Sequence, residues 1–285
     1  MSEPGAGTDV LAMRSTATRG GSGTYNLTGS KMWITNGART GSSGGGGGGG
    51  GAEGKEELGD VFLVYARTAP PSAGDRAAHS LFIVEKGMPG FSLGQRIKDK
   101  CGMRASATAE LVFDGVSIPA ATHLVGNEGE AMAHMMRNLE VERLGLAAMS
   151  LGIARRCIDV MSKYAKERVA FGKPINTYGQ IQKNIADSYA EYAAGRAYVY
   201  NPALHMDIHK AGQRIDSDGV KLFCSVMATT VANRAIQTLG GNGYVGEYAV
   251  ERLWRDAKLL EIGGGTLEAH EKNMTRDLSK MDRLP

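Results

Sequence analysis

The chain divides into two parts that differ in the period of their hydrophobic positions. Between residues 25 and 121 the apolar segments are short, rich in β-branched and aromatic side chains, and separated by glycine, proline or charged turns. These segments are YNLTGSKMWITNG, VFLVYART, HSLFIVEKG, GFSLGQRI and AELVFDGVSI. The pattern predicts a β domain that occupies residues 1–125.

From about residue 126 onward the apolar residues recur at i, i+3 and i+4 over long stretches, which is the period of an amphipathic helix. The stretches are AMAHMMRNLEVERLGLAAMSLGIARRCIDVMSKYAKER, YGQIQKNIADSYAEYAAGRAYVY and DGVKLFCSVMATTVANRAIQTL. We predict a helical bundle over residues 126–285. Strands followed by helices, rather than alternating with them, indicate an α+β fold with segregated domains and not a doubly wound sheet.

A low-complexity segment interrupts the β domain at about residues 38–60. It contains eight consecutive glycines, which cannot bury apolar surface. We therefore predict a flexible surface loop between two strands.

Composition narrows the class of protein. With 285 residues, 42% of them hydrophobic and 22% charged, the chain is expected to be soluble and globular. No apolar run approaches the length of a membrane span, and residues 1–10 have neither the basic start nor the apolar middle of a signal peptide. A net charge of +3 without a stripe of Lys and Arg disfavours nucleic-acid binding. Its three cysteines are far apart in sequence, which fits neither a disulfide framework nor a zinc cluster and indicates a reducing compartment.

Two motifs match known chemistry in form only. GNGYVG at residues 241–246 has the G-x-G-x-x-G spacing, but a predicted helix precedes it where a dinucleotide-binding fingerprint needs a strand. HMDIH at residues 205–209 places two histidines one helical turn apart, yet Met206 stands where a zinc hydrolase needs glutamate and no third ligand is evident. A helix end followed by a turn explains the first motif, and a solvated helix end explains the second.

The helix predicted around residue 142 carries a carboxylate within an apolar stripe. At 3.6 residues per turn, Glu140 lies on a different side of this helix from Glu142. Glu142 shares its face with Met135, Leu139, Leu146 and Met149. Burial there would favour the protonated carboxyl by desolvation, which suits a general base that must remove a weakly acidic proton. A buried ion pair with a nearby arginine is the alternative.

Two aromatic motifs allow a functional and a structural interpretation. KERVAFGKPI places Arg168 and Phe171 at a helix end, where they would suit a phosphate and a ring system, or act as a capping arginine and a core phenylalanine. KMWITNG predicts a strand with Trp33 and Thr35 on one face, facing a flat ligand or simply forming an edge strand.

Taken together and in this order, the motifs resemble the acyl-CoA dehydrogenase family of flavoproteins. The matching stretches are MSEPGAGTDV, KMWITNG, FIVEKGMPGF, GMR, ERVAFGKPI, IQTLGGNGY and RDAKLLEIGGGT, and they cover essentially the whole chain. The resemblance implies a barrel-like or sandwich-like middle β domain followed by an up-down helical bundle. It also implies a fragment that lacks the family's N-terminal helical domain, and such a fragment is expected to bind FAD weakly and to turn over poorly.

Within the family, the resemblance implies where the catalytic base lies. Many members carry their catalytic glutamate at the position of Gly264, directly before Gly265 and Thr266. The branches that act on isovaleryl-CoA or on long-chain substrates supply it instead from L-[DE]-x-E-R, which stands here as LEVER at residues 139–143. Glu142 would then be the base, and EIGGGT together with YVY at residues 198–200 favours the isovaleryl branch.

The reaction implied is α,β-dehydrogenation of isovaleryl-CoA to 3-methylcrotonyl-CoA in leucine catabolism. Glu142 would remove the α-proton while the β-hydrogen leaves as hydride to FAD. The Gly264 N–H and the flavin ribityl hydroxyl would polarise the thioester carbonyl. The bare glycines leave room for a branched acyl chain.

Motif positions also imply the ligand contacts. The flavin ring would meet Ser2, Thr8, Trp33, Ile34 and Thr35. The adenosine diphosphate end would be held by Arg168, Phe171, Gln237, Gly240, Gly241, Thr266 and Glu268. The acyl-CoA would meet Thr8, Glu140, Arg143, Gly264 and Gly265.

The implied partners are the acyl-CoA substrate, an electron-transfer flavoprotein and further copies of the chain in a homotetramer, with no nucleic acid, membrane or metal. The implied location is the mitochondrial matrix in a eukaryote and the cytoplasm in a bacterium. A long-chain dehydrogenase, an acyl-CoA oxidase and a non-catalytic family member are the alternatives.

Overall fold

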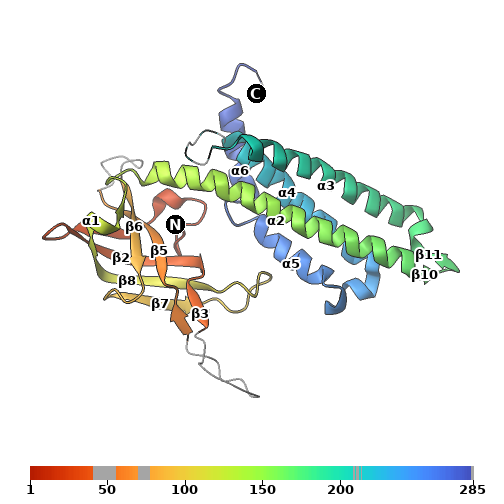
Figure 1. The fold of residues 1–285 in the computed structure, drawn as a ribbon, viewed down its shortest axis with the longest axis horizontal. Helices are drawn as coiled ribbons and strands as arrows, with labels where there is room; N and C mark the ends of the chain where they lie inside the picture. The colour runs from red at the N-terminus through yellow and green to blue at the C-terminus, as the bar shows by residue number, and fades with distance from the viewer. Residues whose placement is uncertain (41–55, 70–77, 208, 210–211, 213, 284–285) are drawn as a thin grey trace, which may run out of the picture. The chain divides into compact units, whose positions relative to one another are not determined.

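A computed structural model describes residues 1–40, 56–69, 78–207, 209, 212 and 214–283, and it is shown in Figure 1. The chain forms two compact units. The first comprises Met1–Lys100 and Arg104–Met135, and the second comprises Cys101–Met103 and Met136–Pro285. The first unit extends to Met135, past the boundary at residue 125 predicted from the sequence.

The first unit is built on a seven-stranded mixed sheet with the strand order β7-β8-β2-β1-β5-β6-β9. Its strands are β1 (Thr16–Arg19), β2 (Thr24–Thr35), β5 (Val61–Arg67), β6 (His79–Glu85), β7 (Phe91–Arg96), β8 (Thr108–Pro119) and β9 (Leu124–Val125). Strands β1 and β5 pair in parallel, and the other five neighbouring pairs are antiparallel. The five strand segments predicted from the sequence coincide with β2, β5, β6, β7 and β8.

Alternation of side chains along the long strands forms the core of this unit. In β8, Leu111, Phe113, Val116 and Ile118 are buried. The rings of Phe91 and Phe113 stack with their centroids 5.1 Å apart. Burial of these apolar side chains stabilises the sheet, and it explains why the two-residue hydrophobic period predicted the strands correctly.

The ends of the predicted glycine loop are strands. Residues Ala38–Thr40 form β3 and Glu56–Leu58 form β4, and these two pair antiparallel. The expectation of a loop over about residues 38–60 is therefore wrong at both ends, because these strands are three residues long and too short to show a hydrophobic period. The glycine run itself lies outside the described residues.

The second unit is helical, which together with the sheet confirms the α+β prediction. Its main helices are α2 (Ala131–Glu167), α3 (Gly179–His205), α4 (Arg214–Leu239), α5 (Val250–Leu260) and α6 (Leu267–Leu278). Helix α4 packs against α3, α5 and α6 (Figure 1). The core is lined by small residues: Ala147, Ala154, Ala228, Ala232 and Ala235 are fully buried. Small side chains let helices approach closely, and a Cβ at Gly195 of α3 would lie 3.3 Å from Cys224 Sγ of α4.

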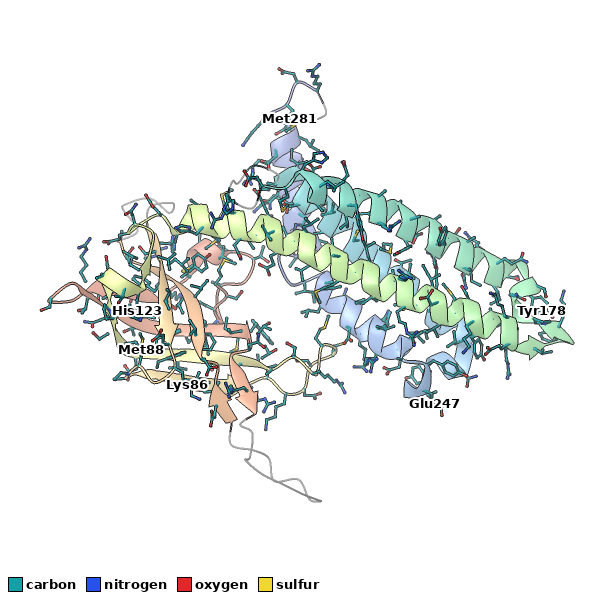
Figure 2. All side chains as sticks on the ribbon, viewed as in Figure 1. Lys86, Met88, His123, Tyr178, Glu247 and Met281 are labelled. Atoms are coloured by element: carbon teal, nitrogen blue, oxygen red, sulfur yellow. The ribbon has the colours of Figure 1, made fainter. Side chains whose placement is uncertain are left out.

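Short elements connect the longer ones. These are the 3₁₀ turns η1 (Val10–Ala12), η3 (Ile175–Thr177), η4 (Gly240–Gly243) and η5 (Gly246–Tyr248), the helix α1 (Ala120–His123), and the strands β10 (Val169–Ala170) and β11 (Lys173–Pro174). Strands β10 and β11 form a hairpin after α2. The Tyr178 hydroxyl donates to the Ala170 carbonyl over 2.8 Å, which fixes this hairpin beside the start of α3 (Figure 2).

Candidate active site

The loop between α5 and α6 exposes backbone rather than side chains. Gly264 and Gly265 have φ values of +68° and +110°, a region that other residues rarely adopt. A Cβ on Gly264 would lie 2.4 Å from Leu146 Cδ1 and 3.7 Å from Glu142 Oε1. The Glu142 carboxylate therefore lies beside the position where a Gly264 side chain would begin.

Helix α2 positions Glu142 differently from the sequence-based expectation. Glu142 is exposed and Glu140 is buried, so the expected burial of Glu142 is wrong. Of the apolar residues on its face, Leu146 is only half-buried and Met149 is 47% exposed. The buried side chains of α2 after Leu139 are of mixed size: Glu140, Arg143, Ala147, Ser150, Leu151, Ile153, Ala154, Cys157, Met161, Tyr164 and Ala165. Glu142 is not among them.

Arg143 links α2 to the glycine loop. Its Nη1 lies 2.8 Å from Asp218 Oδ1 of α4, and its Nε donates to the Gly264 carbonyl over 3.2 Å. Burial lowers the pKa of Arg143, while the negative charges of Asp218 and Glu142 oppose this shift. Arginine stays cationic even so, and its charge-assisted bonds fix the first peptide plane after Gly264.

Two further side chains hold the next carbonyl. Lys221 Nζ donates to the Gly265 carbonyl over 2.8 Å, and His270 Nε2 lies 3.0 Å from the same oxygen. The other ring nitrogen of His270 lies 2.6 Å from Asp218 Oδ1. Burial, reinforced by repulsion from Arg143, lowers the pKa of Lys221 to about 8.

Sequence reasoning did not single out Asp218, Lys221 or His270. A signal was present in α4, where Asp218 and Lys221 stand three residues apart and therefore share a face at the start of a long apolar run. His270 gave no local signal, because its partner Asp218 is 52 residues away in sequence.

Glu140, a predicted substrate contact, takes part in a different set of interactions. Its carboxylate accepts from the Gly212 N–H, with N–O distances of 3.1 and 3.2 Å. Arg214, two residues further on, forms an ion pair with Asp277 of α6. Hydrogen bonding to Arg214 holds the pKa of Asp277 below its usual range. Glu140 thus faces the start of α4, and its contact with a thioester stays a prediction.

Phe171, a predicted cofactor residue, occupies a strained turn. Phe171 and Gly172 connect β10 to β11 with φ values of +49° and +80°. Two-residue hairpin turns of this type strongly prefer Asn or Gly at the first position. Phe171 is 96% exposed, which excludes the core alternative. Strained backbone with an exposed aromatic ring is typical of binding sites, and Arg168 is exposed at the same hairpin.

The remaining candidates of the second unit lie at helix ends. Gln237, Gly240 and Gly241 are exposed where α4 ends, and no heavy atom lies within 4 Å of a Cβ built on either glycine. Thr266 caps α6 by accepting from Ala269 N over 3.3 Å. Glu268 lies in the first turn of α6, where bonds from its own backbone N–H and from Thr266 lower its pKa.

The candidates of the first unit fall around a bulge in β2. The pairing register of β2 shifts between Lys31 and Ile34, and Trp33 has φ +66° and is 62% exposed. The Met32 N–H donates to the Ser2 carbonyl over 2.9 Å, which brings Ser2 beside Trp33. Thr8 and Thr35 are exposed. The helix before GNGYVG, which is α4, agrees with the exclusion of a dinucleotide fingerprint.

A buried ion pair supports this first group. Lys31 Nζ lies 2.7 Å from Glu3 Oε1, and Glu3 also accepts from the N–H groups of Arg14 and Ser15 over 2.6 and 3.0 Å. Burial works to raise the pKa of Glu3, but these hydrogen bonds outweigh it and hold the pKa below the usual range. Within the described ranges, no group of three or more His, Cys, Asp or Glu side chains is placed to bind a metal, and no helix is both long and apolar enough to cross a membrane.

Comparison with known proteins defines the class. Profiles of the acyl-CoA dehydrogenase middle domain and C-terminal domain match residues 55–116 and 129–279. The fold matches butyryl-CoA dehydrogenase from Megasphaera elsdenii with a TM-score of 0.85 at 36% identity, over 98% of this chain and 66% of that one. A solved chain described as an electron-transferring flavoprotein of Acidaminococcus fermentans matches with a TM-score of 0.85 at 35% identity, over 98% of this chain and 67% of that one.

The chain belongs to the acyl-CoA dehydrogenase family, whose members are FAD-dependent flavoproteins. Among curated relatives, isovaleryl-CoA dehydrogenase of Oryza sativa and 2-methylacyl-CoA dehydrogenase of Solanum tuberosum are each 41% identical over 98% of this chain. The chain spans 62% of the length of both relatives.

Proposed function

We propose that the protein catalyses FAD-dependent α,β-dehydrogenation of a short branched-chain acyl-CoA, with isovaleryl-CoA as substrate and 3-methylcrotonyl-CoA as product. The observation that carries this proposal is the position of the Glu142 carboxylate, 3.7 Å from where a Cβ of Gly264 would be. A base on α2 and bare backbone on the α5–α6 loop thus lie together. The names of the relatives support a branched short-chain substrate.

Glu142 acts on the α-carbon of the thioester. Its exposed carboxylate is open to a ligand, and its oxygen takes the α-proton. The Gly264 N–H donates to the thioester carbonyl, which stabilises the negative charge that develops on this oxygen as the proton leaves. Bound acyl-CoA excludes water from the carboxylate, which strengthens both interactions.

The residues present fit a flavin nucleotide. Trp33 and Phe171 expose aromatic rings on left-handed backbone, and Gly240 and Gly241 leave backbone open at a helix end. FAD, when bound, takes the β-hydrogen together with its electron pair. The residues that would hold it are the predicted ones: Ser2, Thr8, Trp33, Ile34, Thr35, Arg168, Phe171, Gln237, Gly240, Gly241, Thr266 and Glu268.

The biological setting is proposed on the same basis. Electrons pass to an electron-transfer flavoprotein, a partner supported by the match to the chain from Acidaminococcus fermentans. The chain acts as a homotetramer in leucine catabolism. Relatives named as mitochondrial support the matrix as its location in a eukaryote, with the cytoplasm as the location in a bacterium.

The test is the variant Glu142→Gln in the full-length, FAD-loaded protein. Anaerobic addition of isovaleryl-CoA should bleach the flavin of the parent, and the rate should fall by about 10²–10⁴-fold in the variant, as for loss of a general base. Asp159→Asn is the matched control, because Asp159 is an exposed carboxylate about 25 Å further along the same helix. Equal bleaching in Glu142→Gln and parent would overturn the assignment of the base.

Substrate and acceptor profiles then separate the alternatives. Faster bleaching by straight long-chain thioesters than by isovaleryl-CoA would indicate a long-chain dehydrogenase. Stoichiometric oxygen uptake during turnover would indicate an oxidase. A parent protein that holds no flavin, or whose flavin no acyl-CoA bleaches, would be a non-catalytic member of the family.

A further inference from the structure

Both ring nitrogens of His270 face hydrogen-bond acceptors. The ring is fully buried between α4 and the glycine loop. Nδ1 lies 2.6 Å from Asp218 Oδ1, and Nε2 lies 3.0 Å from the Gly265 carbonyl oxygen. A backbone carbonyl only accepts, so Nε2 must carry a hydrogen for this contact to be favourable.

The Asp218 contact requires the second hydrogen. Asp218 Oδ1 also accepts from Arg143 Nη1 over 2.8 Å, and this adjacent cation favours the ionised carboxylate over the protonated acid. A neutral ring with hydrogen on Nε2 would set a lone pair of Nδ1 against that oxygen. A neutral ring with hydrogen on Nδ1 would set a lone pair of Nε2 against the Gly265 carbonyl. Only the doubly protonated ring satisfies all three contacts.

We propose that Asp218 holds His270 as a buried imidazolium, and that His270, Arg143 and Lys221 form a cationic clamp on the carbonyls of Gly264 and Gly265. Arg143 holds the first carbonyl, and Lys221 and His270 hold the second. These residues are positioning residues, since they act through the backbone. The clamp fixes two successive peptide planes that follow the Gly264 N–H.

The clamp has a second effect through the direction of the backbone. Arg143 and His270 both contact the buried carboxylate of Asp218, whose Oδ2 finds no partner among the described residues. Glu140 and Glu142 also act on Arg143, and Glu261 and Glu142 act on Lys221, so negative charges stand among these cations. Because the clamp holds the two carbonyls in place, it keeps the Gly264 N–H directed at a bound thioester carbonyl, where negative charge develops. This consequence rests on the proposed function, whereas the protonation of His270 does not.

The first test measures the ring directly in the unaltered chain. The protein is labelled with ¹⁵N-histidine, which gives ring signals from six residues, and the His270 signals are assigned by their loss in His270→Gln. We expect both His270 nitrogens to carry hydrogen in the parent, and only one of them to carry hydrogen in Asp218→Asn. A neutral His270 ring in the parent at pH 7 would overturn the proposal.

The second test measures the backbone. Amide hydrogen exchange of residues 264–266 should accelerate by about tenfold or more in His270→Gln and in Asp218→Asn, because each loses a charged hydrogen bond that restrains the loop. His205→Gln is the matched control, since His205 is exposed and bonded to Asn201 within α3. Unchanged exchange in both clamp variants would show that His270 does not position the loop. Neither measurement uses turnover, so failure of the Glu142 assignment leaves both outcomes readable.

Discussion

The two units fix their candidate ligand-binding backbone with charges of opposite sign. In the first unit, the carboxylate of Glu3 accepts the N–H groups of Arg14 and Ser15, and one buried cation, Lys31, balances it. In the second unit, cationic side chains donate to the carbonyls of Gly264 and Gly265, and the buried carboxylate of Asp218 contacts Arg143.

This difference determines which backbone groups each unit holds in place. The pair of Glu3 and Lys31 orders backbone N–H groups and leaves little net charge, which suits contacts with a neutral ring. The clamp orders two successive carbonyls and thereby the direction of the Gly264 N–H, which suits a reaction that builds negative charge on a bound carbonyl. The first arrangement therefore serves the structure, and the second also serves the proposed reaction.

The largest expected effect comes from breaking the balanced pair. Glu3→Gln leaves the fully buried Lys31 cation without its counter-ion, and losing one partner of a buried pair costs about 3–5 kcal/mol of the free energy of unfolding. Trp33 reports on the first unit when the other tryptophan is removed by Trp254→Phe, because each unit contains one of the two. Urea unfolding followed by Trp33 fluorescence in this background measures the loss.

The double variant Glu3→Gln with Lys31→Met is the control for that prediction. It removes the unpaired charge as well, so it should recover part of the lost stability. The losses in the free energy of unfolding are compared with those of the two single variants. A loss in the double variant as large as the sum of the two single losses, or larger, would show that the charges do not act as a pair.

Local patterns explain what the sequence could predict. The long strands and helices followed from hydrophobic periods because each period is a short-range property, as in β8 and α4, whereas the three-residue strands β3 and β4 were too short to show one. The buried face of α2 did not follow, since alanine and serine give a weak hydrophobic signal, Leu146 is only partly buried and Met149 is exposed. The cationic clamp was missed for a different reason: it joins three helices and a loop, and only the tertiary fold brings His270 to Asp218.

The buried cation Lys221 should affect the pH dependence of the free energy of unfolding, although Glu261, Glu142 and Asp218 partly offset the lowering of its pKa. In the folded chain the pKa of Lys221 falls from 10.5 to about 8, first through burial and then through repulsion from Arg143. Below pH 8 Lys221 is protonated in both the folded and the unfolded chain. The free energy lost by burying its charge therefore does not change with pH. Between pH 8 and 10.5 the unfolded chain binds more protons than the folded chain. The free energy of unfolding therefore rises with pH in this window. Above that window the effect is absent.

Lys221→Met should remove this rise. The slopes of unfolding free energy against pH should differ by at most one proton, about 1.4 kcal/mol per pH unit, with Gly265 still held by His270. Urea unfolding at pH 7 to 10, followed by Trp254 fluorescence in a Trp33→Phe background, measures both slopes. The buried Cys157 and Cys224, whose pKa burial raises to about 12, act equally in both chains. Lys272→Met is the control, because Lys272 is exposed on α6 and its loss should leave the parent slope unchanged. A slope in Lys221→Met equal to that of the parent would contradict a buried Lys221 cation.

The smallest expected effect comes from adding a side chain to the glycine loop of the second unit. Gly264→Ala forces an L-residue to keep φ +68°, which costs about 1–2 kcal/mol of the free energy of unfolding. The new Cβ would also lie 2.4 Å from Leu146 Cδ1, and the end of this flexible side chain can move aside. Urea unfolding followed by Trp254 fluorescence measures the change.

The neighbouring Gly263 provides the matched control. Its φ lies outside the left-handed region, and its nearest contact to a new Cβ is Leu259 O at 3.5 Å, an ordinary van der Waals distance. Gly263→Ala should therefore be neutral or stabilise the chain by up to about 1 kcal/mol, because alanine restricts the unfolded state. Equal stabilities for the two alanine variants would mean that the left-handed backbone does not require glycine at 264, and that the bare loop is kept there for the ligand alone.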